Sequence, residues 1–291
     1  MLLGKRLQTT TYTLPAGPSQ KEDICIVFLT DLHDACGPQD ADRLVTSVKA
    51  CRPDLILCGG DMIVSRDDHV PEKTAMVLAR LAGEAPFFYA SGNHEARVRR
   101  IWESASGKER QRKRAYLRFR RILEKAGVLF LENADERLTL RGMPVRVCGL
   151  DPDMRYYRRV HGPQMPPEEI REIFGSPDPQ EYTILLAHTP RLMQAYARWG
   201  ADLTLCGHYH GGVMRLGPHR GLISPDLRLF PGNAYGIFQN GQKTTIVSAG
   251  CGEHTIPIRI GNPREIVCCR LAAGKAETED SYGNTREAAG I

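Results

Sequence analysis

Short apolar runs recur along the chain, and each of them ends in a small group of polar residues. The most continuous runs are Ile24–Leu29, Asp54–Cys58, Pro86–Ala90, Tyr182–Ala187 and Asp202–Cys206. Short runs with β-branched or aromatic content are typical of strands that are covered on both faces. The pattern therefore predicts core strands with polar side chains at their carboxyl ends.

The segments between these runs have the period of an amphipathic helix. Apolar residues are spaced for a helix over Asp40–Ala50, and the helices expected over Pro71–Leu81 and Pro190–Trp199 each begin with proline. Strand, helix and strand therefore alternate. This alternation is typical of α/β proteins whose core strands are parallel.

Shorter apolar runs predict a second sheet. Its candidate strands are Val128–Leu131, Arg137–Leu140 and Val145–Leu150. Gly211–Gly241 is expected to be a loop region, and the closing strands of the chain are expected at Ile246–Ser248 and Ile266–Cys269. We therefore predict an α/β chain of the α+β type, folded as a four-layer α-β-β-α sandwich with two mixed β-sheets flanked by helices. One domain is expected over residues 1–272, followed by a disordered tail over residues 273–291.

Charge is nearly balanced overall but unevenly distributed. The 291 residues include 39 basic and 34 acidic side chains, and the net charge of +5 does not by itself indicate a nucleic-acid partner. The basic stretch Arg97–Arg121 contains Trp102 and Tyr116, so we expect a helical insertion or lid over residues 97–125. It is either a solvated helix whose aromatic residues pack on the core or a lid that attracts an anionic substrate. A second basic, aromatic patch at Arg155–Arg159 is expected on the surface.

Cysteine usage favours a reducing compartment. Most of the nine cysteines lie inside apolar runs, where a thiol packs as a small hydrophobic group, and the sequence contains no Cys-x-x-Cys pair. It also contains no apolar stretch long enough for a signal peptide or a membrane span. We therefore expect a cytoplasmic protein, with peripheral contact to an anionic membrane as an alternative.

The polar clusters at the expected strand ends contain the residue types of metal sites. Asp31 and His33 follow the first strand, and side chains two residues apart in an extended segment point to the same side. The other clusters are Gly60-Asp61, Ser91–Glu95, His188 and Gly207–His210. Because loops at the carboxyl ends of neighbouring parallel strands converge, we expect these clusters to meet in space.

Taken in order, these motifs resemble those of the calcineurin-like metallophosphoesterases. The matching residues are Asp31-Leu32-His33, Gly60-Asp61, Gly92-Asn93-His94-Glu95, His188 and Gly207-His208-Tyr209-His210. The resemblance covers about residues 24–270. Within the family, Gly221–Ile223 and Pro257–Ile260 look most like the branch that includes the bacterial YkuE and YaeI phosphodiesterases. The resemblance implies the metallo-dependent phosphatase fold and hydrolysis of phosphate esters.

The chemistry of phosphoester hydrolysis asks for these residue types independently. Two divalent ions roughly 3.5–4 Å apart can clamp a phosphate and activate one water as hydroxide, and they need an anionic bridge with mixed nitrogen and oxygen ligands. Asp61 is the natural bridge. The resemblance assigns the remaining ligands to two sets: Asp31, His33 and His210 for one metal, and Asn93, His188 and His208 for the other.

Imidazole and carboxylate ligands suit Mn, Fe or Zn better than Mg or Ca, so two divalent transition-metal ions are the expected cofactors. His94 belongs to neither ligand set in the family pattern. The resemblance implies that it stabilises charge on the phosphoryl oxygens or protonates the leaving oxygen. The remaining histidines are weaker candidates, with His254 at the pocket border and His69, His161 and His219 at the surface.

The leading interpretation is a metallophosphoesterase that acts on phosphomonoesters or phosphodiesters. A nuclease is its main rival because of the Arg-rich segment, which nevertheless lacks a recognisable nucleic-acid module. Two further hypotheses are a peripheral hydrolase of lipid-linked or cell-wall phosphates and a non-catalytic scaffold. A scaffold predicts missing ligands, and none is missing. The sequence indicates no obligate protein partner.

Overall fold

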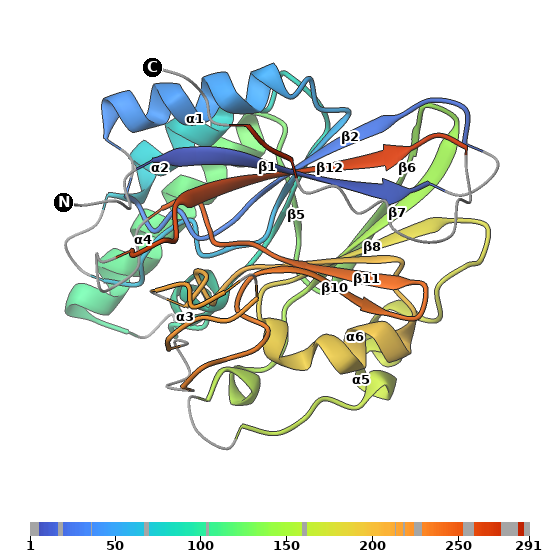
Figure 1. Ribbon diagram of the computed structural model, residues 1–291. Coiled ribbons are helices and arrows are strands. Elements are labelled where there is room, and N and C mark those ends of the chain that lie inside the picture. Colours follow the sequence, from blue (N-terminus) through green and yellow to red (C-terminus); the bar gives the residue numbers. More distant parts are fainter. Residues whose placement is uncertain are drawn as a thin grey trace.

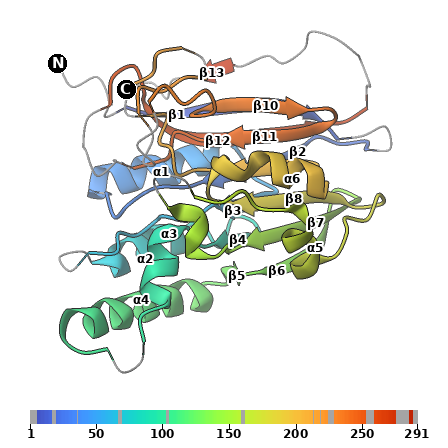
Figure 2. The same ribbon diagram turned by 90° about the horizontal axis from the view of Figure 1, so that it is seen from below.

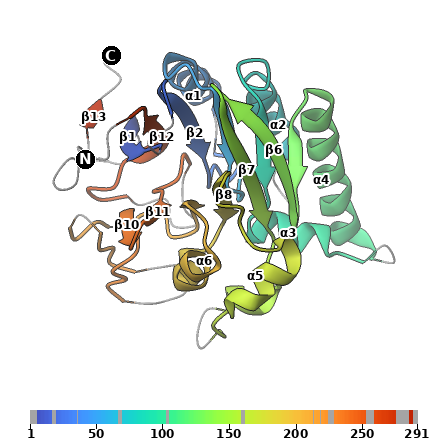
Figure 3. The same ribbon diagram turned by 90° about the vertical axis from the view of Figure 1, so that its right-hand side faces the viewer.

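Two β-sheets pack face to face and helices cover their outer faces, which confirms the predicted sandwich (Figure 1, Figure 3). The computed structural model describes residues 6–16, 20–35, 37–66, 70–102, 105–158, 162–212, 214–217, 219–223, 229–252, 259–274 and 285–287. The elements and contacts described belong to these residues.

The first sheet contains the amino-terminal strands and the last strands of the described chain. Its order is β13-β1-β12-β2-β3-β4-β5. The bounds are β1 Leu7–Pro15, β2 Ile24–Leu29, β3 Leu55–Cys58, β4 Phe87–Ala90, β5 Leu129–Leu131, β12 Arg264–Ala272 and β13 Thr285–Glu287. Strands β2 to β5 are parallel, whereas β12 runs antiparallel to β2 and parallel to β1. The sheet is therefore mixed.

The second sheet is also mixed, with the order β10-β11-β9-β8-β7-β6. The bounds are β6 Ala134–Leu140, β7 Met143–Leu150, β8 Tyr182–Ala187, β9 Leu203–Cys206, β10 Gly236–Asn240 and β11 Lys243–Val247. Its four inner strands are parallel, and both edge strands pair antiparallel with their neighbours.

Helices form the two outer layers (Figure 3). The bounds are α1 Pro38–Ala50, α2 Pro71–Ala79, α3 Asn93–Arg99, α4 Gly107–Lys125, α5 Pro167–Phe174 and α6 Met193–Trp199, with 3₁₀ turns η1 Met154–Tyr157 and η2 Pro190–Leu192. Helices α1, α2 and α4 cover the first sheet, and α5 and α6 cover the second. Figure 2 shows α2 and α4 side by side.

Each pair of adjacent layers encloses its own buried apolar cluster. Val27 packs under the helices of the first sheet, while its neighbour Phe28 packs between the two sheets. Successive strand residues point to opposite faces, so a strand buried on both faces is apolar throughout. This explains why the sequence showed continuous apolar runs instead of alternation.

Two local predictions were wrong. The run Val128–Leu131 gives β5, which pairs with β4 in the first sheet, because α4 crosses over and returns the chain to the same sheet. The expected loop Gly211–Gly241 contains β10, which forms a hairpin with β11. The basic segment is helical at the end of α3 and along α4, with a break around Ile101.

The expected tail contributes one short strand, since Thr285–Glu287 pairs with β1. The other tail residues from 275 onward lie outside the described part of the chain. Among the described residues, no helix has both the length and the apolar character that crossing a bilayer requires.

Candidate metal centre

Asp31, His33 and His210 meet at the carboxyl ends of β2 and β9. His210 Nε2 lies 3.3 Å from Asp31 Oδ1, and His33 Nε2 lies 3.7 Å from the same oxygen. The Nε2 atoms of the two histidines are 3.0 Å apart. Two imidazole nitrogens and one carboxylate oxygen thus converge on one small volume, which is the donor set of a divalent transition-metal site.

A second group lies directly beside the first and consists of Asp61, His188 and His208. His188 Nε2 is 3.0 Å from Asp61 Oδ2, and its Nδ1 is 2.8 Å from the Gly59 carbonyl oxygen. A carbonyl can only accept, so the Nδ1 atom carries a proton and Nε2 is the nitrogen that faces the centre, where loss of its own proton would free a lone pair for a metal. The neutral ring would then be the tautomer that a metal-ligating histidine needs.

The Asn93 amide can present either its oxygen or its nitrogen to the centre. The inward atom lies 3.2 Å from Asp61 Oδ2 and 2.9 Å from His208 Nδ1. With nitrogen inward the amide donates hydrogen bonds to both, and with oxygen inward it offers the ligand atom that a cation between them would require. Imidazole nitrogens with carboxylate and amide oxygens form a donor set that fits the implied metal.

The backbone that presents these side chains is strained. Asp31, His33, Asp61, His208 and His210 all have positive φ angles, between 48° and 67°. This left-handed region is sparsely populated by residues other than glycine, and such strain is concentrated at functional sites. The prediction that Asp31 and His33 share a side through extended alternation was wrong in its reasoning, because two left-handed residues, not a strand, bring them together.

Glu95 is buried and braces the loops that carry Asp61 and Asn93. Its carboxylate accepts hydrogen bonds from the backbone N–H groups of Asp61 (2.8 Å), Met62 (2.9 Å) and Gly92 (3.0 Å), and from the Tyr89 hydroxyl (2.7 Å). The bond from Gly92 is half of a capping box at the start of α3. Gly60 has φ +85°, and a side chain there would collide with the Gly92 backbone, so the two loops pack in direct contact.

Asp31 connects the two halves of the chain. Its carboxylate accepts the backbone N–H of His208 at 3.0 Å and the Thr30 hydroxyl at 2.9 Å. Its backbone carbonyl accepts the N–H of Gly252 at 3.0 Å. Asp31 therefore connects residues that are far apart in the sequence, and these contacts do not depend on a bound cation.

The electrostatics of the cluster favour positive charge at its centre. Burial alone would raise the pKa of Asp61, but His188 and His94 outweigh it and hold that pKa well below its usual range. Burial alone would likewise lower the pKa of His188, yet the Asp61 carboxylate raises it to about 10. At the other group, burial alone would lower the pKa of His33, but the Asp31 carboxylate raises it. The carboxylates thus attract the charge that a metal would supply.

His94 lies beside both groups and forms a third group of possible metal ligands with His33 and Asp61. Its Nδ1 accepts the backbone N–H of Ser65 at 2.9 Å, so the ring proton of the neutral form is on Nε2. Burial lowers the pKa of His94 to about 4, which keeps the ring neutral. Its ring meets that of His33 edge to face, with centroids 5.0 Å apart. His94 is therefore placed as a neutral N–H donor at the rim of the centre.

The structure brings all eight predicted site residues together: Asp31, His33, Asp61, Asn93, His94, His188, His208 and His210. His219 is exposed, as expected. His69, His161 and His254 lie outside the described residues. The interpretation of the Arg155–Arg159 patch as surface was wrong for Tyr157, which is buried against His188 and His208.

Sequence reasoning also missed two charged side chains. Glu95 had a detectable signal, since it stands at the third helical position after Gly92. Arg259 had none, because its partners come from distant loops. It is buried, donates to the carbonyls of Ala249 (2.9 Å) and Gly252 (2.6 Å), and lies 3.3 Å from His210 Nδ1.

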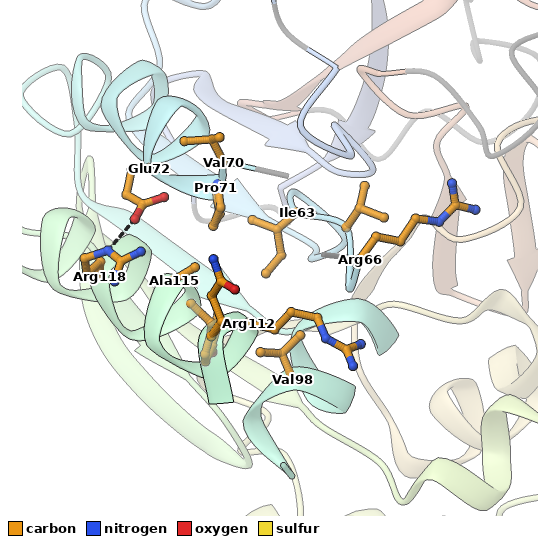
Figure 4. Close-up of a pocket in the computed structure, with 12 residues that line it drawn as sticks. Ile63, Arg66, Val70, Pro71, Glu72, Val98, Arg112, Ala115 and Arg118 are labelled. Carbon is orange, nitrogen blue, oxygen red and sulfur yellow. Dashed lines mark hydrogen bonds and ion pairs between the residues drawn. The ribbon is translucent and has the colours of Figure 1, made fainter. Parts of the chain in front are cut away.

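The basic helix α4 is connected to the site through the side chain of Arg112. The buried face of α4 carries Tyr116 and Phe119, and Trp102, which precedes the helix, is 82% exposed. A groove of about 270 Å³ opens between α2 and α4, with an apolar floor that includes Ile63 and arginines at its edge (Figure 4). Arg112 there donates to the Ser65 carbonyl at 3.2 Å, next to the N–H that holds His94.

Comparisons with known proteins also indicate a metallophosphoesterase. A family model described as calcineurin-like phosphoesterase matches residues 25–212. An uncharacterized metallophosphoesterase of Campylobacter jejuni is 27% identical over 264 residues, which are 89% of this chain and 62% of that protein. The uncharacterized metallophosphoesterase YkuE of Bacillus subtilis is 23% identical over 285 residues, 91% of this chain and 85% of that protein.

The chain thus spans less than two thirds of the length of the Campylobacter relative. Among solved structures, phosphopantetheinyl hydrolase from Mycobacterium tuberculosis aligns with 77% of this chain and 88% of its own, at 16% identity and a TM-score of 0.44.

We predict that Glu95→Gln destabilises the protein and weakens metal binding. The new amide N–H₂ would face backbone donors, and we expect a loss of about 1–3 kcal/mol, or roughly 2–10 °C in Tm. Manganese affinity, measured by calorimetry, should fall about 10- to 100-fold. Tyr89→Phe, which removes one donor of the set, is the control and should have a smaller effect. Wild-type affinity in Glu95→Gln would show that the carboxylate does not hold the ligand loops.

Proposed function

The chain belongs to the calcineurin-like phosphoesterase family, and we propose that it is a metal-dependent hydrolase of phosphomonoesters or phosphodiesters. The observation that carries this proposal is the convergence of electron-pair donors from five strand ends on three overlapping groups, two of which share Asp61. Such a cluster is electrostatically unfavourable unless cations occupy it. We expect two ions of Mn, Fe or Zn.

In the proposed site, Asp31, His33 and His210 would hold one ion, Asn93, His188 and His208 the other, and Asp61 both. Two divalent ions, when bound, polarise a phosphoryl oxygen and lower the pKa of a water nucleophile. The protein orients these ligands through Glu95 and through the backbone contacts of Asp31. His94 would donate its Nε2 proton to the leaving oxygen or to a phosphoryl oxygen.

A second observation concerns the exposed face of α4. Arg110, Arg114, Arg121 and Lys125 lie along one side of the helix at intervals of four or seven residues, and they make no ion pair with any described residue. Leu117, in the middle of this row, is 48% exposed. This row favours an anionic substrate or an anionic surface such as a membrane. Nucleic acid fits the charge, but no described module supports base recognition.

We predict that Asp61→Asn abolishes activity and most metal binding, because the bridging position serves both sites. Metal content after dialysis, measured by elemental analysis, should fall from about two ions to less than one per chain. Asp42→Asn, at a side chain that is 68% exposed on α1, is the matched control and should keep both properties. Full metal content in Asp61→Asn would remove Asp61 from the bridging position.

We predict that His94→Ala leaves metal content nearly intact and lowers kcat by roughly 10²–10⁴-fold. If His94 protonates the leaving oxygen, p-nitrophenyl phosphate should lose less rate than an alkyl phosphate, since its leaving group needs little protonation. Equal losses on both esters would assign His94 to charge stabilisation alone. Wild-type rates on both would exclude it from the reaction.

We predict that the α4 row acts on substrate capture. Arg114→Gln with Arg121→Gln should lower kcat/KM by a few-fold to about 10-fold at low ionic strength and leave kcat unchanged. The difference should disappear near 1 M salt, where the Debye length is about 3 Å. Arg171→Gln with Arg198→Gln, on α5 and α6, makes the same charge change elsewhere and should have little effect. A fall in kcat at every ionic strength would contradict a purely electrostatic role.

A further inference from the structure

Tyr157 lies against the second group of candidate ligands. It is the last residue of η1, which follows β7 closely, and its side chain is 6% exposed. Its ring centroid is 5.7 Å from that of His208, in an edge-to-face arrangement, and 6.3 Å from that of His188. The side chain thus forms part of the wall beside Asp61, His188 and His208.

The Tyr157 hydroxyl has no hydrogen-bond partner among the described residues, although the atom is buried. The hydroxyl groups of two other buried tyrosines, by contrast, have hydrogen-bond partners. The Tyr156 hydroxyl donates to Glu169 at 2.7 Å, and the Tyr196 hydroxyl donates to the Thr189 carbonyl at 3.0 Å. A buried hydroxyl without a partner is unfavourable, and native proteins keep few of them without a purpose. An orphan donor beside a candidate metal site indicates that a ligand supplies the missing acceptor.

The chemistry of the proposed substrate defines that acceptor. A tyrosine hydroxyl can donate one hydrogen bond, and the strongest partner for such a donor is a negatively charged oxygen, which a phosphate supplies.

We propose that Tyr157 contacts the substrate by donating a hydrogen bond to a phosphate oxygen on the His188 and His208 side of the centre. This inference rests on the proposed function. His94 contacts His33 of the first ligand group, whereas Tyr157 contacts His188 and His208 of the second. A phosphate between them would receive one N–H and one O–H hydrogen bond in addition to the two cations.

The test compares two neighbouring variants that each remove one hydroxyl. In manganese-loaded Tyr157→Phe, orthophosphate affinity measured by calorimetry should fall roughly 10- to 100-fold, the usual effect of losing a hydrogen bond to a charged group. Metal content should not change, and Tm should be unchanged or higher because an unpaired buried hydroxyl is gone. Tyr156→Phe is the control, with lower Tm and wild-type phosphate affinity.

Two results would overturn the inference while leaving the proposed function intact. If Tyr157→Phe binds orthophosphate as the wild type does while Tm falls, the hydroxyl has a structural partner such as a water. If its metal content falls, Tyr157 supports the ligands and does not contact the substrate. A wild-type protein that holds manganese but neither binds orthophosphate nor hydrolyses any ester would overturn the proposed function and this inference together.

Discussion

The mutual repulsion of Asp31 and Asp61 is the constraint around which the molecule is arranged. Both carboxylates are almost fully buried, and each must be compensated by oriented donors. Asp31 receives the N–H of His208, and Asp61 receives the N–H of His94 at 2.7 Å. Asp31, Asp61 and His208 have left-handed backbone angles in the loops that make these contacts, so electrostatic compensation and local strain occur in the same residues.

Two buried glutamates, Glu95 and Glu265, hydrogen-bond to the loops around the candidate centre and stabilise them. Glu95 braces the loops after β3 and β4. Glu265, on β12, accepts hydrogen bonds from the hydroxyl of Tyr235 (2.7 Å) and the backbone N–H of Ala249 (2.9 Å). The adjoining backbone then pairs with the loop after β2, since Cys251 N–H donates to the Thr30 carbonyl at 2.9 Å. Two buried carboxyl groups thus hold the loops of the candidate centre in place.

Sequence reasoning predicted the fold best for strands that are buried on both faces, because these strands are continuously apolar. Apolar runs such as Ile24–Leu29 located the core strands, and their polar ends located the candidate ligands, because a parallel sheet gathers its strand ends at one edge. Features set by long-range contacts left no such trace. Tyr157 stands in a basic stretch that looks exposed, and β5 gave no local sign of which sheet it joins. The left-handed angles at Asp31 and His33 were also invisible, since neither residue type requires them.

The position of β12 has a consequence for how the protein is made. This strand, Arg264–Ala272, lies between β1 and β2, which are neighbours in sequence but not in the sheet. On the ribosome, β1 and β2 must wait until Arg264–Ala272 has emerged before their shared partner is present. Contacts of such high sequence separation slow folding. The first sheet is therefore incomplete until β12 is made, and the half that carries Asp31 and Asp61 is exposed in the meantime to wrong pairing at its open edge.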